Sequence, residues 1–428
     1  NGGKLSGREA RRLPVNTILS GPAGGVIGAH EVAKSAGYSR IISFDMGGTS
    51  TDVCLIEGGK VDVSYEREIA GYTCRLPSVG IHTVGAGGGS VAWIDSGGSL
   101  RVGPRSAGSK PGPACYGRGG TQPTVTDADV VLGRIGSETA LGGSLHIDAA
   151  MAARAVASIA EPLGLTVEEA ALGIVRIAES TMAGAVRTVS VDAGSDPATA
   201  HLVAFGGAGG LHATAVARGL GMAGAIIPPL GGVFSAVGLL LSPPRTDGVA
   251  AVHVVGNDLE VAVSSARHLV DSTSEAVQRA GSAVDRTELH LDVRYIGQAH
   301  ELGVPWDMDL GMASVVDRFE ALHEKRYGFA RSGDPVEVVA VRCSAFGRAP
   351  LAVLPDPHIG TSNTEGAVRS VIDPAGRRVD ATVVRREALP VGFSLDGPAI
   401  VEEEQATTWI DTGERLVVSE NGSLVVTW

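Results

Sequence analysis

The sequence predicts an α/β protein built from strands, glycine-rich turns and buried helices. Three apolar runs follow one another within residues 41–65, separated by a polar turn and by Gly58-Gly59, which is typical of consecutive antiparallel strands. A capping box at residues 166–169 begins a long apolar helix. A further strand at 201–205 leads through glycines into a helix at 211–219. Strands mixed with buried helices in this way indicate the α/β class.

Length and composition indicate several domains and a cytoplasmic setting. The chain has 428 residues, more than one domain usually contains, and 44% of them are apolar, which is enough for a large core. Glycine occurs 60 times and aromatic residues make up only 4%, so we expect an aliphatic core and many tight turns. The net charge of −12 argues against nucleic acid or a membrane surface as the main partner.

Cysteine usage fits a reducing compartment. The four cysteines contain no CxxC pair, so nothing in their spacing predicts a zinc cluster or a disulfide scaffold. Residues 219–241 carry no charge, but Pro228-Pro229 and several glycines interrupt them. A buried strand, a turn and a short helix are therefore expected there rather than a membrane helix.

A change in composition near residue 250 predicts domain boundaries. Glycine thins and charge rises beyond this point, and short strands follow residue 350. We expect a glycine-rich domain at 1–248, an α+β domain at 249–348 and a β-rich C-terminal domain at 349–428. Near the start, a glycine-containing turn at 20–25 is expected to precede a small-residue helix at 26–36, which either faces an anion or packs closely.

The polar turn between the first two strands is the main candidate site. Asp45 and Asp52 flank it and are placed to hold a metal ion or its water shell. The turn itself supplies amides and hydroxyls that can cradle phosphate oxygens, from Gly47, Gly48, Thr49, Ser50 and Thr51. No helix has room to follow it, which separates it from a P-loop or a dinucleotide turn. A glycine-rich hairpin with surface acids is the alternative.

A second candidate turn follows the strand at 201–205. Gly206, Gly207, Ala208 and Gly209 precede a helix, so the backbone there could approach a nucleoside or a phosphate. His212 occupies the third glycine position of a dinucleotide fingerprint, and no acid lies about 20 residues further on. A mononucleotide site therefore suits this turn better.

Two further segments have open interpretations. Residues 84–94 form another strand, glycine turn and strand, and a long irregular stretch at 102–126 has the character of a loop that wraps over a site. Asp127 and Asp129 follow this stretch. They either cap the next helix or support a metal ion from behind its ligands.

Taken together, eight motifs resemble the hydantoinase A/5-oxoprolinase family, which also includes nucleotide-binding subunits of acetone-type carboxylases. They span nearly the whole chain in the family's order, at residues 20–25, 45–52, 85–90, 111–120, 204–213, 234–239, 294–302 and 397–403. The resemblance implies an actin/sugar-kinase/Hsp70-like (ribonuclease H-like) nucleotide-binding lobe, accompanied by α+β and β-rich regions. By this resemblance, the domain at 1–248 is a hydantoinase A-type nucleotide-binding domain.

The resemblance also implies ATP and Mg²⁺ as cofactors. Asp45 would orient Mg²⁺ through water, and Asp52 would support it or act as a polarising base. Residues 47–51 would bind phosphates, and 206–209 would approach the nucleoside. Transfer of the γ-phosphoryl group to an amide oxygen would make the ring carbon electrophilic and the oxygen a good leaving group.

The implied activity is ATP-dependent hydrolysis of a cyclic amide such as hydantoin, N-methylhydantoin, 5-oxoproline or a related lactam. A hydantoinase B-type subunit is the implied partner. The family carries an Asp-x-Gly-Gly-Thr motif twice, and this sequence contains only the second. We therefore expect the chain to be either a fragment or a split subunit whose N-terminal lobe is carried by another polypeptide. The alternatives are the nucleotide-binding subunit of a ketone carboxylase and a non-catalytic scaffold lobe.

Overall fold

The computed structural model describes residues 2–4, 7–12, 14–61, 63–64, 67–69, 71–74, 78–137, 142–349 and 366–428. The chain forms two compact units. The first comprises Asn1–Ser20, Val63–Val79 and Leu239–Ala352, and the second comprises Gly21–Asp62, Gly80–Gly238 and Val353–Trp428. Both candidate turns belong to the second unit. The three-domain division drawn from composition remains a prediction.

A nine-stranded sheet organises the second unit. In chain order its strands are β1 (Arg40–Met46), β2 (Thr51–Glu57), β3 (Lys60–Val61), β8 (His82–Val84), β11 (His201–Phe205), β12 (Gly224–Ile227), β19 (Ser394–Asp396), β22 (Arg415–Val418) and β23 (Leu424–Thr427). Their order across the sheet is β19-β22-β23-β12-β11-β1-β2-β3, and β8 also pairs with β2. Strands β1, β11 and β12 run parallel, whereas β2 is antiparallel to β1 and β3 is antiparallel to β2. The predicted hairpin and the strand at 201–205 are confirmed.

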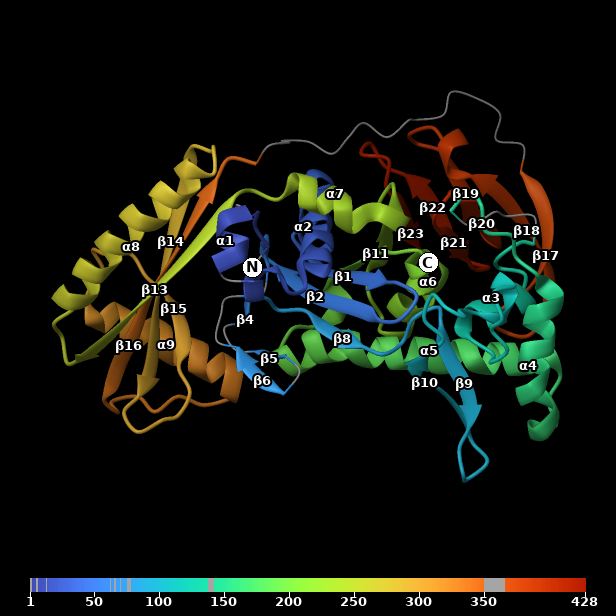
Figure 1. Ribbon diagram of the computed structural model, residues 1–428, viewed down its shortest axis with the longest axis horizontal. Coiled ribbons are helices and arrows are strands. Elements are labelled where there is room, and N and C mark those ends of the chain that lie inside the picture. Colours follow the sequence, from blue (N-terminus) through green and yellow to red (C-terminus); the bar gives the residue numbers. More distant parts are fainter. Residues whose placement is uncertain are drawn as a thin grey trace. The chain divides into compact units, whose positions relative to one another are not determined.

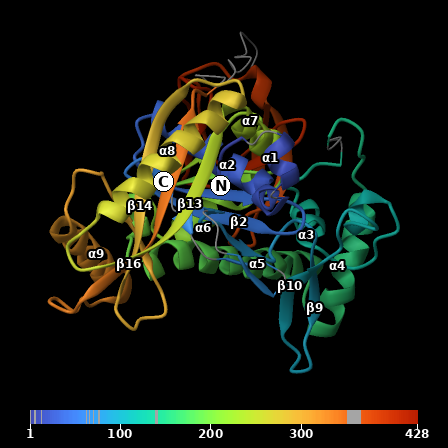
Figure 2. The ribbon, with the colours of Figure 1, turned by 60° about the vertical axis from the view of Figure 1, so that its left-hand side comes forward.

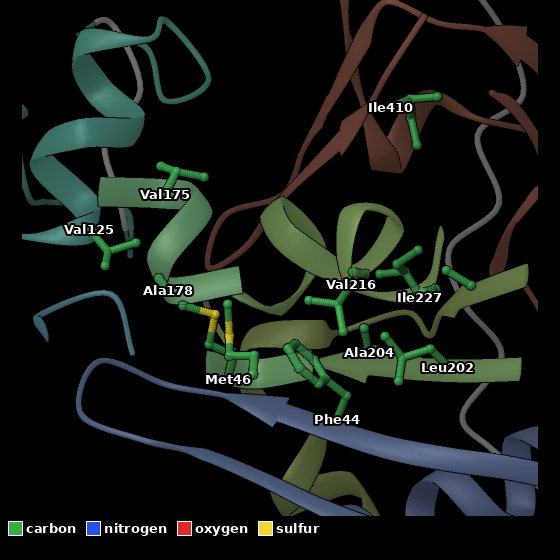
Figure 3. Close-up of a cluster of buried hydrophobic side chains, with 14 of the residues drawn as sticks. Phe44, Met46, Val125, Val175, Ala178, Leu202, Ala204, Val216, Ile227 and Ile410 are labelled. Atoms are coloured by element: carbon green, nitrogen blue, oxygen red, sulfur yellow. The ribbon is translucent and has the colours of Figure 1, made fainter. Parts of the chain in front are cut away.

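Helices cover both faces of this sheet, which is why β1 and β11 are buried along almost their whole length. Helix α2 (Ser20–Ser35) lies on one side of β1 and β2, and α5 (Val167–Val189) lies on the other (Figures 1 and 2). Figure 3 shows Phe44 and Met46 of β1 beside Ala178 of α5 and Leu202 and Ala204 of β11. The core is largely aliphatic, as the composition predicts.

Helix α5 begins as its capping box predicts. The Thr166 side chain accepts a hydrogen bond from the Glu169 amide, and the Glu169 side chain accepts one from the Thr166 amide. Its apolar residues are buried against α3 (Val125–Val131), α4 (Ala149–Leu163) and α6 (Gly209–Gly219). The predicted central, buried helix is therefore confirmed.

Helix α2 begins earlier than predicted, because the glycines at its start serve packing. The sequence indicates a turn at 20–25, yet the helix already begins at Ser20. A Cβ on Gly25 would lie 2.5 Å from the Phe205 ring, and one on Gly28 would lie 2.8 Å from the Phe234 ring. Close approach of this helix to its neighbours therefore requires glycine, and the close-packing alternative is the correct one.

The C-terminal residues of the second unit contribute to two sheets. Four strands form a small sheet in the order β17-β18-β20-β21, namely β17 (Ala367–Ile372), β18 (Arg378–Arg385), β20 (Ala399–Glu402) and β21 (Thr407–Ile410). The other three, β19, β22 and β23, extend the nine-stranded sheet beside β12. Short apolar runs in the sequence predict strands at 399–401, 407–410, 416–418 and 424–427, and the structure confirms all four.

The first unit is a four-stranded antiparallel sheet with two helices. The strands follow the order β13-β16-β14-β15, with bounds β13 (Arg245–Val255), β14 (Val284–Tyr295), β15 (Leu302–Pro305) and β16 (Val336–Gly347). Figure 2 shows α8 (Glu260–Arg279) lying along β13 and β14, and α9 (Met312–Tyr327) packs against β15. The sequence predicts helices at about 258–281 and 313–327, and α8 and α9 confirm both. Short elements complete this unit: α1 (Gly7–Arg12), η1 (Pro14–Thr17), β4 (Val63–Ser64), β5 (Arg67–Ile69), β6 (Tyr72–Cys74) and β7 (Ser78–Val79).

The uncharged stretch at 219–241 has the predicted strand, turn and short helix, with β12 followed by η5 (Gly231–Val233) and α7 (Phe234–Leu241). Within the part of the chain that the structure describes, no single helix is long and apolar enough to cross a membrane. Only α4 and residues 167–193 pass that test together, and they are bent by 93° relative to each other.

The close packing of α2 on α7 predicts an asymmetry between two glycine substitutions. A Cβ on Gly238 would collide with Gly24 O and lie 2.9 Å from Gly28 N, whereas a Cβ on Gly184 in α5 would meet nothing within 4 Å. We expect Gly238→Ala to lower the free energy of unfolding by about 1–3 kcal/mol through overpacking. Gly184→Ala should raise it by about 0.5–1 kcal/mol. Denaturant titration checks both, and equal effects would contradict the packing described.

Candidate functional site

Asp45 and Asp52 lie opposite each other on the paired strands β1 and β2. Residues opposite each other in an antiparallel pair project from the same face of the sheet, so both carboxylates lie on one side of it. Asp45 is partly buried, and its Oδ2 accepts a hydrogen bond from Ser235 Oγ at 2.8 Å. The Thr83 hydroxyl donates to Asp52 Oδ1. The structure therefore brings together the two acids that the sequence singled out.

The pKa of Asp45 is raised above that of an ordinary aspartate. Burial is the main cause, the hydrogen bond from Ser235 opposes it, and repulsion from Asp52 adds to it. A cation placed between these carboxylates would favour their ionised forms. The pair is thus an unfavourable arrangement of charge that a bound cation would relieve.

The residues of the turn between these strands differ in their exposure to solvent. Gly48 and Thr49 are exposed and Ser50 is half-buried, so their amides and hydroxyls are near the surface. Thr51, by contrast, is buried, and its Oγ1 donates to Ala86 O at 2.6 Å. Within the turn, Gly47 N donates to Ser50 O at 3.1 Å. The Thr51 hydroxyl therefore holds the neighbouring segment, unlike those of Thr49 and Ser50.

A second glycine turn, at residues 85–90, packs directly on the first. It lies between β8 and β9 (Ser90–Ile94), which pairs with β10 (Leu100–Ser106). Gly88 N donates to Gly47 O at 3.0 Å, and Gly89 N donates to Gly48 O at 2.6 Å. A Cβ on Gly87 would lie 2.7 Å from the carbonyl carbon of Thr49, so only glycine fits there. The sequence identifies both turns but does not show that they stack.

The third glycine turn, at 206–209, meets β1 because β11 runs parallel to it. Parallel pairing places the carboxyl ends of both strands together, where open α/β sheets bind ligands. Gly206 has φ +85°, and a Cβ there would collide with Met46 O and lie 2.7 Å from Asp45 Oδ1. Ala208 N donates to Met46 O at 3.2 Å. Gly207 is exposed and Ala208 is half-buried, which leaves this turn accessible from outside.

The predicted residues therefore gather at one edge of the sheet. Asp45 is the last residue but one of β1, and the exposed part of the first turn and the turn at 206–209 follow the carboxyl ends of β1 and β11. Backbone amides and hydroxyls suit phosphate oxygens, and two carboxylates suit a Mg²⁺ ion held through its water shell. Among the described residues, no group of three or more His, Cys, Asp or Glu side chains is placed to hold a metal ion directly.

The loop at 107–126 is tied down by Asp127. This buried carboxylate accepts hydrogen bonds from Ala114 N at 3.2 Å, Cys115 N at 2.8 Å and Thr124 N at 3.0 Å. Thr124 is the N-cap of α3, and Asp127 completes a capping box with it. Of the two alternatives for Asp127, helix capping is therefore confirmed.

A buried charged cluster lies behind the turns, and it consists of Asp129, Arg134, Glu179 and His212. The His212 ring is fully buried, with Nδ1 3.2 Å from Glu179 Oε1 and Nε2 3.3 Å from Asp129 Oδ2. Arg134 Nη1 lies 3.6 Å from Asp129 Oδ1 and 3.8 Å from Glu179 Oε1, with its Cζ 5.6 Å from the centre of the Trp409 ring. Sequence reasoning missed this cluster, because its members come from α3 and the turn after it, from α5 and from α6, which are distant in sequence.

His212 carries a positive charge in this cluster. Burial alone would disfavour the charged ring, but Asp129 and Glu179 outweigh it and raise the pKa of His212 to about 9. Two carboxylates then face one guanidinium and one imidazolium, so the buried charges balance. The ring is held protonated for a structural reason: the neutral form would leave an excess negative charge in the core.

Comparison with known proteins places the chain in a family. A family model described as Hydantoinase/oxoprolinase matches residues 1–247, more than half of the sequence. The chain belongs to this family. The family expected from the motifs is thereby confirmed, and its other known members include both hydrolases and carboxylases.

Three relatives illustrate the range. The caprolactamase subunit alpha of Pseudomonas jessenii is 33% identical over 449 residues, covering 100% of this chain and 64% of that protein. The acetone carboxylase beta subunit of Xanthobacter autotrophicus is 30% identical and covers 97% of this chain and 62% of that protein. The 5-oxoprolinase of Saccharomyces cerevisiae is 30% identical and covers 96% and 33%, respectively. The chain thus spans less than two thirds of each of these relatives.

Solved structures give the same picture. The ATP-dependent caprolactamase from Pseudomonas jessenii superposes with a TM-score of 0.85 at 33% identity, covering 96% of this chain and 62% of that one. The nucleotide-free structure of an acetone carboxylase superposes with a TM-score of 0.78 at 26% identity, covering 99% and 63%. Both neighbours support the mixed α/β fold.

The charge on His212 predicts how stability depends on pH. Its pKa is about 9 in the folded chain and about 6.5 when unfolded, so its stabilising contribution is complete below pH 6.5 and is lost as the pH rises through 9. The difference in unfolding free energy between wild type and His212→Gln should shrink by an amount on the order of 3 kcal/mol between pH 6 and pH 10. Denaturant titrations at the two pH values measure it. A difference that grows with pH would show that the ring is neutral in the folded protein.

The contact between Gly206 and β1 predicts a second effect. Gly206→Ala should lower the unfolding free energy by about 2–4 kcal/mol, because it combines a strained positive φ with a collision against Met46 O. Gly221→Ala is the matched control, since it has φ +66° but nothing within 4 Å of its Cβ. Gly221→Ala should lower the unfolding free energy only by the backbone strain of the positive φ, about 1 kcal/mol. If both variants lower the unfolding free energy equally, the close contact between the third turn and β1 is absent.

Proposed function

We propose that this chain supplies the nucleotide-binding part of an ATP-dependent enzyme that opens a cyclic amide. The observation that carries the proposal is its similarity to the ATP-dependent caprolactamase, which extends along essentially the whole chain in both sequence and structure. The convergence of Asp45 with the glycine turns provides a place for the nucleotide's phosphates. The substrate proposed is hydantoin, N-methylhydantoin, 5-oxoproline or a related lactam.

We further propose that the second unit is an actin-like, ribonuclease H-like lobe. Three antiparallel strands, β3, β2 and β1, adjoin two strands parallel to β1, and this order supports the assignment. In such lobes the phosphates lie against strand–turn–strand motifs, which agrees with the position of the turn at 47–50. Two of the named relatives, those of the caprolactamase and the acetone carboxylase, are subunits, so the proposed partners are a hydantoinase B-type subunit and a polypeptide carrying a second lobe.

The chain's residues would act by positioning and charge stabilisation. The amide of Gly48 and the hydroxyls of Thr49 and Ser50 would bind phosphate oxygens, while Gly47, whose amide donates to Ser50 O, would shape the turn. The backbone at 206–209 would approach the nucleoside. Asp45, oriented by Ser235, would hold the water shell of Mg²⁺, and Asp52 would keep that water polarised. The ion, when bound, neutralises charge on the transferring phosphoryl group. Together these groups would align the γ-phosphorus with the amide oxygen.

Asp45→Asn tests the role of the first acid. The substituted side chain keeps an acceptor for Ser235 but loses the charge that would hold the ion. We expect lactam-dependent phosphate release by the assembled enzyme to fall at least about 100-fold, with the thermal midpoint preserved. Asp380→Asn is the control, an exposed strand carboxylate in β18 of the same unit, and it should leave the rate unchanged. Unchanged turnover in the Asp45 variant would remove Asp45 from the mechanism.

A second candidate function is ATP-dependent carboxylation of a ketone. The similarity to the acetone carboxylase beta subunit, in sequence and in structure, favours it. The two reactions differ in the acceptor of the phosphoryl group, so substrate-dependent phosphate release separates them. We expect release with a lactam and little with a ketone plus bicarbonate. The reverse result would establish the carboxylase, and an assembled enzyme that binds no Mg·ATP would make this chain a scaffold.

A further inference from the structure

The three glycine turns of the second unit are joined in a ring of contacts that runs through the cluster around His212. From the first turn, Gly47 O accepts from Gly88 N at 3.0 Å. Gly88 O then accepts from both Thr126 N and Thr126 Oγ1, each at 2.8 Å. Thr126 lies in the first turn of α3. This half of the ring therefore connects the first turn, through the second turn, to helix α3.

The other half returns to the same strand. Asp129, nearly one helical turn after Thr126, faces His212 on α6 with 3.3 Å between Oδ2 and Nε2. Helix α6 begins at Gly209, and Ala208 N just before it donates to Met46 O at 3.2 Å. Met46 immediately precedes Gly47. The ring is thus closed, and the contact between Asp129 and His212 is its link between α3 and α6.

We infer that His212 is a positioning residue for the nucleotide site, an inference that rests on the proposed function. Its ring is fully buried and touches neither the exposed part of the first turn nor Asp45, so it acts through α3 and α6. Glu179 on α5 holds the opposite ring nitrogen, so His212 bridges three helices. Without its charge, Asp129 and Glu179 would share only Arg134, so the repulsion between them would push α3 and α5 apart and weaken the contact of α6 with both helices.

The consequence concerns both sides of the nucleotide at once. The α3 half of the ring fixes the turn proposed to bind phosphates, and the α6 half fixes the turn proposed to approach the nucleoside. Loss of the His212 contacts would make the distance between these two turns more variable, without altering any group that touches the ligand. ATP binding should therefore suffer more than binding of the amide substrate.

The test uses His212→Gln in the full chain, assembled with its partner subunits. Leu416→Ala is the control for general destabilisation, because Leu416 is a fully buried core residue on β22 outside the ring. The first measurement is amide hydrogen exchange of peptides covering residues 84–92 and 203–210, without nucleotide. We expect faster exchange in both peptides for His212→Gln and no change in either for Leu416→Ala. Unchanged exchange in the His212 variant would show that His212 does not link these turns and would overturn the inference.

The second measurement is the ATP dependence of lactam-driven phosphate release. We expect the KM for ATP to rise about tenfold in His212→Gln, while the KM for the lactam stays within about twofold. An unchanged KM for ATP, or an equal rise in Leu416→Ala, would overturn the positioning role. Failure of wild type to bind Mg·ATP would instead remove the proposed function and the role in ATP binding, and hydrogen exchange would still decide whether His212 links the turns.

Discussion

The parallel pairing of β1 with β11 is the constraint on which the site depends. It sets Asp45 beside Phe205, so that the chain leaving each strand meets the other immediately beyond the sheet. The contacts of the third turn with β1 follow from this arrangement of the strand ends. Gly206 must be glycine because it faces Met46 O and Asp45 Oδ1, and Ala208 can donate to Met46 O only because the two strands end together.

Two kinds of interaction hold the turns that converge there. Backbone hydrogen bonds join neighbouring turns at distances that only glycine permits, which explains why so much glycine is concentrated in the second unit. Behind them, the cluster of Asp129, Arg134, Glu179 and His212 joins α3, which contacts the second turn, to α6, which follows the third. The burial of these four charges is tolerable because they balance, and that balance requires a protonated His212.

Much of the fold follows from local patterns in the sequence. The hairpin at 41–56 and the capping box of α5 are specified by neighbouring residues, and both appear as predicted. The start of α2 is different: a glycine run usually indicates a turn, but packing against Phe205 and Phe234 makes it helical. Tertiary contact there overrides local preference.

The site is predictable only in part, for the same reason. Asp45, Asp52 and the glycines of the turns at 47–51 and 206–209 can be identified from the sequence, because each motif is short and continuous. The stacking of Gly88 on Gly47 depends on strand pairing between segments far apart in the chain, and the sequence does not report it. His212 appears in sequence only as the residue that replaces a fingerprint glycine, since its partners come from α3 and α5.

The central claim is that the three converging turns bind Mg·ATP. The most direct measurement is amide hydrogen exchange of the assembled enzyme with and without Mg·ATP, read over the peptides that contain residues 47–50, 85–90 and 206–209. The account predicts that the nucleotide slows exchange in these three segments and leaves the α8–α9 region unchanged. Nucleotide binding that protects other segments and leaves these three unaltered would contradict it.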